Sequence, residues 1–451
     1  MSAVAYSERL PVRARSQRWA PALVGLLSLL LIAATLEIVL DGALGHSPLV
    51  PPSPDIAGWL EGIGERLGYR VFLIALLVSV GAYAGLVALS GRSSGESAGA
   101  AVMPWRWAIA LVAALQLIVF AGPVLLSTDV FSYLAYARMG VEHGLNPYTH
   151  GPVAIVGDPV FKYVGKDWIH VATAYGPLYT LLSYPLAPLG LVGALWAMKL
   201  EALLASAGTL ALIWRCACTR GLDPARAILI VGANPLYVIY GLGGAHNDLI
   251  MMLAMMAAVS LTIAPAPTRG REATAAATVV AGALIKATVA VLLPFMIVSR
   301  RRLGPIVGAL AAIALGALVG YVAFGIHGID VVAALNRDAA FVSTDSFATE
   351  IAHLVGKPGV FPIDHDLLKA ALVLVILHLL WRTWRGYDWV AASGWALLAI
   401  SVTSTWLLAW YILWPLPLAV VTRDRRLLVA TLVVQALFVI HQISPLLAPV
   451  E

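Results

Sequence analysis

Long apolar runs stand out when the hydrophobic and polar positions of the chain are followed in order. Many of the runs reach about twenty residues, which is the length that an α-helix needs to cross the hydrocarbon core of a bilayer. The pattern predicts membrane helices near residues 19–40, 70–90, 106–126, 190–214, 227–243, 247–264, 304–326, 367–384, 388–404, 406–422 and 427–447. The chain is therefore expected to be an all-α polytopic membrane protein.

Two segments do not fit a simple count of spans. Residues 273–299 form one apolar run with arginines at both ends, which predicts a hairpin of two short helices that turns at residues 286–288. Residues 175–188 are short and contain three prolines, so they are expected to form a partial or re-entrant helix. Such backbone survives at membrane depth only where protein or a wet cavity covers it, and this points to a site. The expected total is roughly 11–14 membrane segments.

The composition supports a membrane protein. Of the 451 residues, 61% are hydrophobic and only 12% are charged, and the mean hydropathy is +0.88, whereas a soluble domain needs more polar surface. The first apolar run is longer than a signal-peptide core and lacks a small-x-small cleavage site, so we expect a retained anchor. Cys216 and Cys218 are expected to be free cytosolic thiols rather than metal ligands.

Most arginines lie in short turns between the predicted helices. The turns with residues 9–18, 92–106, 215–226, 269–271, 300–302, 382–385 and 423–426 hold 19 of the 23 arginines. Because basic residues in short loops mark the cytoplasmic face, the N-terminus is expected in the cytoplasm. The other segments hold eight of the ten histidines and most acids. We therefore expect a multi-pass protein of the plasma membrane whose chemistry faces outside, with the lipid bilayer and no nucleic acid as partner.

Two of the outer loops are long. Residues 127–173 and 325–366 carry charged, aromatic and histidine residues. We expect residues 1–105 to form a cytoplasmic tail with two additional transmembrane helices. Residues 106–451 are then expected to form a single membrane domain that contains both loops.

An aspartate lies close to the start of the first outer loop, at the mouth of a predicted membrane helix. Partial desolvation at such a position raises the basicity of a carboxylate, so Asp129 is a candidate general base. The residues that follow, up to Gly144, have apolar positions at helical spacing. They predict a short amphipathic helix in the membrane interface, for which a plain interfacial anchor is an acceptable interpretation. Tyr175, beside glycine and proline, belongs to a stretch that suits a rigid pocket-shaping loop.

A second polar group lies between two predicted helices on the outer side. His246, Asn247 and Asp248 follow Gly243 and Gly244. Capping of a helix explains one or two of these polar residues but not all three. The sequence therefore favours contacts with a hydroxyl-rich ligand.

Lys286 is a lone cation inside an apolar run. A lysine at the bilayer centre costs roughly 2.5–3.5 kcal/mol on insertion scales, so a partner or a function is expected. A lipid phosphate is the favoured partner. A buried carboxylate, or snorkelling from the hairpin tip, remains the alternative.

The last cluster is aromatic and contains Trp410 and Tyr411 next to two prolines. Aromatic residues at a membrane interface usually anchor the protein there. A sugar-stacking wall beside a broken helix is equally compatible with this pattern.

Five stretches, taken in order, resemble the membrane-embedded glycosyltransferases of the GT-C superfamily. They are STDVFSYLAYARMGVEHGLNPYTHGP, AYGPLYTLLSYPLA, GGAHNDLIM, LIKATVAVLLPF and WLLAWYILWPLPLA. Within the superfamily they are similar to the actinobacterial alpha-1,6-mannosyltransferases of the MptA/MptB type, which use polyprenyl-phosphate-mannose. The resemblance extends from about residue 120 to residue 420.

The resemblance implies the GT-C fold and transfer of a hexose, expected to be mannose, from a polyprenyl-phosphate donor to a glycan or glycolipid acceptor. Such a reaction serves lipomannan or cell-envelope mannan synthesis. Asp129 matches the aspartate that this class places at the start of its first large outer loop. Paired acids are common at that place, whereas here Thr128 precedes Asp129. A donor without a nucleotide diphosphate needs little metal help, so neither a metal nor another cofactor is expected.

The remaining roles are assigned by position. Lys286 and Arg138 are candidates for binding the donor phosphate, and Asp129 would accept the proton of the acceptor hydroxyl. Contacts with the sugar or the acceptor are expected from Tyr175, His246, Asn247, Asp248, Trp410 and Tyr411. A polyprenyl-linked sugar flippase or transporter is the alternative, because it would also have broken helices and intramembrane charge.

Overall fold

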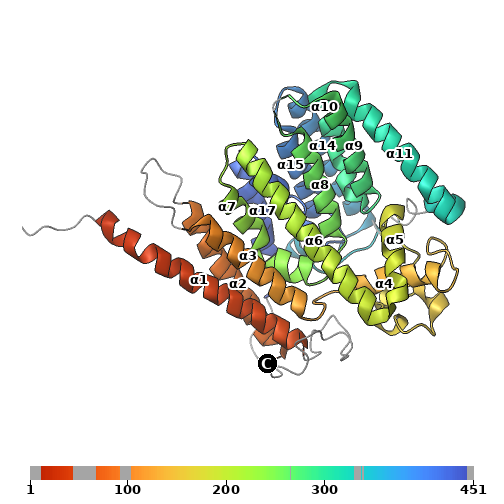
Figure 1. Cartoon of the computed structure of the whole chain (residues 1–451), viewed down its shortest axis with the longest axis horizontal. Helices are drawn as coiled ribbons and strands as arrows, with labels where there is room; N and C mark the ends of the chain where they lie inside the picture. Colours follow the sequence, from red (N-terminus) through yellow and green to blue (C-terminus); the bar gives the residue numbers. More distant parts are fainter. Residues whose placement is uncertain are drawn as a thin grey trace, which may run out of the picture.

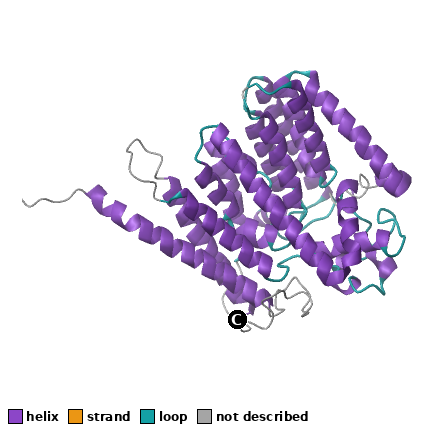
Figure 2. Cartoon of the chain, in the orientation of Figure 1, coloured by secondary structure: helices purple, strands orange, loops and turns teal. Residues whose placement is uncertain are grey.

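The computed structural model describes residues 12–43, 68–91, 103–264, 266–329, 337 and 340–443. Throughout this part the chain is helical and has no strand (Figure 2). The expected cytoplasmic tail up to residue 11 and part of the second outer loop, residues 330–336 and 338–339, lie outside the described residues. The expectation of an all-α chain is confirmed.

The α-helices are α1 Val12–Ala43, α2 Gly68–Ser90, α3 Trp105–Ala121, α4 Asp129–Val141, α5 Pro177–Ser183, α6 Gly190–Thr219, α7 Pro224–Gly232, α8 Asp248–Thr262, α9 Arg269–Ala283, α10 Leu292–Arg300, α11 Leu303–Phe324, α13 Phe347–Leu354, α14 Pro362–Trp384, α15 Trp389–Thr403, α16 Leu416–Val420 and α17 Arg425–Gln442. A π-helix, η8, covers Leu236–Leu242, and 3-10 turns cover Ala287–Val291 (η9) and Tyr411–Leu413 (η11). Helices α1 and α11 form opposite edges of the molecule (Figure 1).

Several helices are long and apolar enough to cross a membrane. In the described part of the chain they are Ala20–Ala43, Tyr69–Ser90, Pro177–Thr219, Leu303–Gly328 and Arg425–Gln442, and the bent pair α7–η8 is a sixth candidate. Five further apolar helices are shorter. A polytopic membrane protein is confirmed, but fewer segments reach full length than the 11–14 expected. The difference arises because stretches such as 406–422 are broken into turns and short helices.

Residues 269–302 form the hairpin that the flanking arginines predict. Helix α9 ends at Ala283, and α10 returns after η9. The residues that follow α10 lie beside the start of α9, because Arg302 Nη1 lies 3.5 Å from Glu272 Oε1. Lys286 is therefore in the turn of this hairpin, as expected. The 175–188 segment is also short, because α5 gives way to a 3-10 turn at Tyr184.

The expected helix over residues 227–243 is bent by 54° between α7 and η8. The break falls at Pro235, which has no N–H to continue the helix. Asn234 compensates, because its Oδ1 accepts the backbone N–H groups of Leu236 at 3.0 Å and Tyr237 at 3.2 Å. The π-helix η8 that follows leads directly into the loop with Gly243.

Helix α4 is the main correction to the expected architecture. An interfacial anchor would expose an apolar face to lipid, whereas Phe131, Leu134 and Ala135 are fully buried. The helix packs against α5, α6 and the 3-10 turn Tyr184–Leu189, and α4 and α5 lie together at one end of α6 (Figure 1). The plain-anchor interpretation is wrong, because protein and not lipid covers the apolar positions.

Four helices begin at the turns that hold the arginines. Asp223, Thr268, Asp388 and Asp424 cap α7, α9, α15 and α17 with their side chains, which satisfies N–H groups that have no partner inside a helix. Arg220 pairs with Asp388, and Arg423 Nη2 donates to Arg220 O at 3.1 Å. These contacts gather turns that are far apart in sequence on one face of the molecule.

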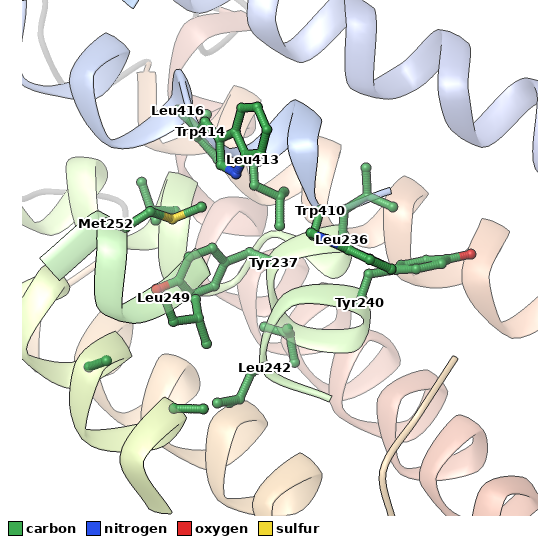
Figure 3. Packing of buried hydrophobic residues seen from close by; sticks show 14 of the residues in the cluster. Leu236, Tyr237, Tyr240, Leu242, Leu249, Met252, Trp410, Leu413, Trp414 and Leu416 are labelled. Carbon is green, nitrogen blue, oxygen red and sulfur yellow. The ribbon is translucent and has the colours of Figure 1, made fainter. Parts of the chain in front are cut away.

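The core lies between η8, α8 and the aromatic segment after α15. Tyr237, Leu249 and Met252 pack with Leu413 and are fully buried (Figure 3). Burial of such side chains contributes about 1.5–3 kcal/mol each. Trp414, which belongs to the same cluster, also lines one of the cavities described below.

Candidate active site

Asp129 is the first residue of α4 and lies at the wall shared by two cavities. Its backbone N–H donates to Ser127 Oγ at 3.1 Å, which closes a tight turn before the helix. The side chain is 17% exposed. A partly buried carboxylate between two spaces can contact a molecule in each of them.

The first cavity has a volume of about 230 Å³. It lies between α4, the loop before α5, the hairpin turn at Lys286 and the aromatic segment after α15. Its lining residues include Ser132, Tyr136, Trp168, Tyr175, Lys286, Thr288, Ser404, Trp406, Tyr411 and Trp414. The mixture of aromatic rings, hydroxyls and one cation suits a sugar with a phosphate.

The second cavity is larger, about 580 Å³, and lies on the other side of Asp129. Helices α2 and α17 contribute Tyr69, Phe72, Phe438 and Gln442, and Asp345 and Trp410 complete the wall. Trp168, Trp406 and Leu408 line both cavities. Helix α2 therefore contributes to the wall of the second cavity.

Lys286 points into the first cavity and has a protein carboxylate as its partner. Its Nζ lies 2.7 Å from Asp248 Oδ2, and it lies 4.7 Å from the ring centre of Tyr411 and 5.4 Å from that of Trp414. Trp414 Nε1 donates to the other oxygen of Asp248 at 2.6 Å. The buried carboxylate that the sequence leaves open as an alternative partner is therefore present, and binding of a donor phosphate by Lys286 stays a prediction.

His246 and Asn247 lie behind the cavity wall. His246 Nδ1 is 3.5 Å from both Asp129 Oδ2 and the Tyr133 hydroxyl, and its ring stacks on Trp410 at 3.6 Å between centroids. Asn247 Oδ1 accepts the Tyr133 hydroxyl at 3.4 Å. These two residues and Asp248 are buried, and none lines either cavity. In this geometry they contact Asp129, Tyr133 and Lys286, and their contact with a sugar or an acceptor stays a prediction.

The aromatic segment divides between the two cavities. Trp410 lines the second cavity and Tyr411 the first. Trp410 and Trp414 are buried in the protein interior (Figure 3), so they do not serve as interfacial anchors. Tyr175 lines the first cavity and meets Tyr133 edge to face at 4.7 Å.

Arg138 is held away from both cavities. Its Nε lies 2.9 Å from each oxygen of Asp158, and its Nη1 donates to Ala187 O at 3.1 Å. His143 Nε2 lies 2.9 Å from Asp158 Oδ2. Burial alone would raise the pKa of Asp158, but these two partners hold it below its ordinary value. Arg138 thus serves to bind the loop after α4 and lines neither cavity.

Several residues that line the cavities have no distinctive signal in the sequence. Trp168 and Asp345 belong to the long loops and follow no motif, whereas Tyr136 belongs to α4 and to the first of the five quoted stretches but is not distinguished there from its neighbours. Within the residues that the structure describes, no three His, Cys, Asp or Glu side chains are grouped as metal ligands. The site is built instead from the Asp129 carboxylate beside His246, a lysine paired with Asp248, and aromatic rings.

Sequence profiles place this helical membrane protein, with its carboxylate, cation and aromatic cavities, among the membrane glycosyltransferases. The sequence profile described as alpha-(1->6)-mannopyranosyltransferase, N-terminal domain, matches residues 22–302, and the MptB C-terminal domain profile matches residues 365–445. The chain belongs to this alpha-(1->6)-mannopyranosyltransferase family, and it is an enzyme, a membrane mannosyltransferase.

Named relatives agree with the profiles. The chain is 27% identical over 448 residues to alpha-(1->6)-mannopyranosyltransferase A of Mycobacterium tuberculosis, which covers 91% of this chain and 82% of the relative. It is 32% identical over 187 residues to the Corynebacterium glutamicum protein of the same name, which covers 40% of this chain and 36% of the relative. No solved structure matches the chain. The family favours the transferase over the flippase alternative.

Proposed function

We propose that the chain transfers mannose from polyprenyl-phosphate-mannose to a hydroxyl of a glycan or glycolipid acceptor and forms an alpha-1,6 linkage. The reaction takes place at the outer face of the plasma membrane. The observation that carries the proposal is the position of Asp129 between two cavities, one of which contains Lys286. Separate spaces on either side of one carboxylate suit a donor and an acceptor that must meet at that carboxylate.

The donor occupies the first cavity in this proposal. Lysine has three N–H donors, and Lys286 uses one on Asp248, so others remain for a phosphate. Tyr175 and Tyr411 line the same space and supply surfaces for the sugar ring. The acceptor occupies the larger second cavity, next to Trp410 and Asp345.

The chemical step is an inverting displacement. Asp129 takes the proton of the acceptor hydroxyl as that oxygen bonds to the anomeric carbon of mannose. The bond from the anomeric carbon to the phosphate oxygen breaks, and polyprenyl phosphate leaves with the electron pair. General base help of this kind contributes about 10²–10⁴-fold, and a cation beside the leaving phosphate stabilises the developing charge.

The decisive experiment incubates the purified chain with radiolabelled polyprenyl-phosphate-mannose and an oligomannoside acceptor. Asp129→Asn is expected to lower transfer by at least about a hundredfold while the protein folds as before. Asp167→Asn is the matched control, since Asp167 is an exposed acid of the same loop that lines neither cavity. Retention of more than half of the turnover by the Asp129 variant would remove this residue from the catalytic role, and transfer from GDP-mannose alone would refute the lipid donor.

The orientation in the membrane has its own test. The turns with arginines gather on one face. Helix α3 begins at one of these turns, beside Arg106, and its other end leads to Asp129. Single cysteines at His150 and Arg301, in a background that lacks Cys216 and Cys218, are labelled with an impermeant maleimide in intact cells. We expect labelling at position 150 and none at 301, and the reverse result would invert the topology.

A further inference from the structure

A third large cavity, of about 570 Å³, lies between α2, the α7–η8 bend and α17. Its wall runs along α2 from Val80 to Gly91 and along α17 from Arg425 to Val439. At 1.5 Å of rise per residue these stretches are ~16 Å and ~21 Å long. The cavity is therefore an elongated slot parallel to the helices, with the dimensions of a lipid chain.

The slot is apolar along most of its length. Helix α2 contributes Val80, Ala84, Val87 and Ala88, and α17 contributes Leu428, Val429, Leu432, Ala436 and Val439. Two polar side chains at its inner end are already satisfied, since Asn234 Nδ2 donates to Gln435 Oε1 at 2.8 Å and Gln435 Nε2 donates to Ile412 O at 3.1 Å. An alkyl chain can lie against these walls without leaving a polar group unpaired.

The other end of the slot is positively charged. Arg226 and Arg425 line it, and no acidic residue is among its described lining residues. The nearby Asp223 and Asp424 are engaged as helix caps by backbone N–H groups. Arg226 Nε is buried and has no hydrogen-bond partner among the described residues. A buried guanidinium N–H without a partner requires one, and guanidinium groups match phosphate oxygens in geometry and charge.

We propose that this slot is a binding site for an anionic phospholipid, whose phosphate lies at Arg226 and Arg425 and whose acyl chain lies between α2 and α17. The ligand is distinct from the mannosyl donor. Arg425 begins α17, whereas Gln442 at the end of the same helix lines the cavity beside Asp129. The two ends are ~25 Å apart, so a phosphate bound at the arginines cannot react at Asp129. The bound lipid fills the space between α2 and the helices α7 and α17.

The test is native mass spectrometry of the purified full chain after delipidation and incubation with phosphatidylglycerol, phosphatidylcholine or polyprenyl phosphate. Wild type is expected to retain phosphatidylglycerol in preference to phosphatidylcholine. The double variant Arg226→Gln/Arg425→Gln is expected to lose this retention by at least about tenfold, the effect of one charge-assisted hydrogen bond. Arg426→Gln is the matched control, because Arg426 is an exposed neighbour of Arg425 that does not line the slot.

A second pair of variants tests the chain-binding part. Ala88→Trp fills the slot from α2 and is expected to reduce phosphatidylglycerol retention, whereas Leu77→Trp, at an exposed position of α2 outside the slot, is expected to have no effect. Gel filtration confirms that each variant is folded. Equal retention of the two phospholipids, or unchanged retention in the double arginine variant or in Ala88→Trp, would overturn the proposal. Displacement of phosphatidylglycerol by polyprenyl phosphate with the same arginine dependence would assign the slot to the polyprenyl lipid and would also overturn it.

Discussion

The pair of Lys286 and Asp248 makes a sharp prediction about stability. Asp248 is only 1% exposed, and its two oxygens accept from Lys286 Nζ at 2.7 Å and from Trp414 Nε1 at 2.6 Å. Replacing Lys286 by methionine leaves a buried carboxylate with one neutral donor. Breaking a buried pair in this way costs roughly 3–5 kcal/mol, because the remaining charge is uncompensated.

The reverse substitution is expected to cost less. Lys286 is 14% exposed and lines a cavity, so Asp248→Asn leaves an ammonium that water can reach. The rings of Tyr411 and Trp414 remain within 5.4 Å of it, and such contacts are worth roughly 0.5–2 kcal/mol. The asymmetry between the two single variants follows from the difference in burial of the two partners.

Reversible denaturation in detergent micelles measures both effects. Lys286→Met should lose more free energy of unfolding than Asp248→Asn, and the double variant Lys286→Met/Asp248→Asn should recover part of the loss, because it has no buried charge. The charge-preserving Lys286→Arg is the control for side-chain volume. A Lys286→Met protein as stable as wild type would show that Asp248 does not depend on this lysine.

The double variant also separates folding from donor binding. It keeps the cavity but removes the cation. If Lys286 also binds the donor phosphate, affinity for polyprenyl-phosphate-mannose should fall by roughly 1.5–3 kcal/mol, the range for a hydrogen bond to a charged group. Unchanged donor affinity in this folded double variant would refute the phosphate-binding role and leave Lys286 as a structural cation.

Three further variants test positions around the site. His246→Phe preserves the stacking on Trp410 but removes the contact with Asp129. The kcat should therefore fall by about tenfold at constant KM, which is equivalent to ~1.4 kcal/mol. An unchanged kcat would exclude a role of His246 in positioning Asp129. Asp158→Asn should destabilise the protein at neutral pH and make little difference to its stability under acid conditions. The pKa of Asp158 in the folded protein is lowered from 3.8. The contribution of this carboxylate to stability is therefore present above pH 3.8 and is lost as the pH falls below that value. Gly176→Ala should lower the free energy of unfolding by roughly 1–3 kcal/mol through overpacking, because a Cβ at this position would lie 2.0 Å from Leu284 O. In the control Gly157→Ala the added Cβ meets nothing within 4 Å. Thermal unfolding of both variants checks the difference.

The parts of the fold that depend on local patterns could be predicted. The hairpin of α9 and α10 follows from an apolar run with arginines at both ends. The two ends of the run lie together, because Arg300 at the end of α10 and Arg302 just after it contact Glu272 near the start of α9. The long helices α1, α2 and α11 agree with their apolar runs to within a few residues, apart from the start of α1.

Burial and pairing could not be read from the sequence. An apolar stripe on α4 looks the same whether lipid or protein covers it, because lipid tails are as apolar as a protein core. Asp248 was recognised as unusual, but its partner is 38 residues away and its second donor is 166 residues away. Only the tertiary arrangement shows that Asp248 lies behind the cavity wall and pairs with Lys286, which lines the cavity.

The position of Asp129 is set by two strained turns. Leu126 and Ala245 both have left-handed backbone, with φ of 56° and 50°, and neither is a glycine. Such residues cost of order 1–3 kcal/mol each and persist only where the surrounding structure determines them. The two turns are joined by the hydrogen bond from Leu125 N–H to Gly243 O at 2.9 Å, and each leads within three residues to Asp129 or His246. The strain therefore lies where it holds the carboxylate and the imidazole together, and relaxation of either turn would move Asp129 relative to both cavities.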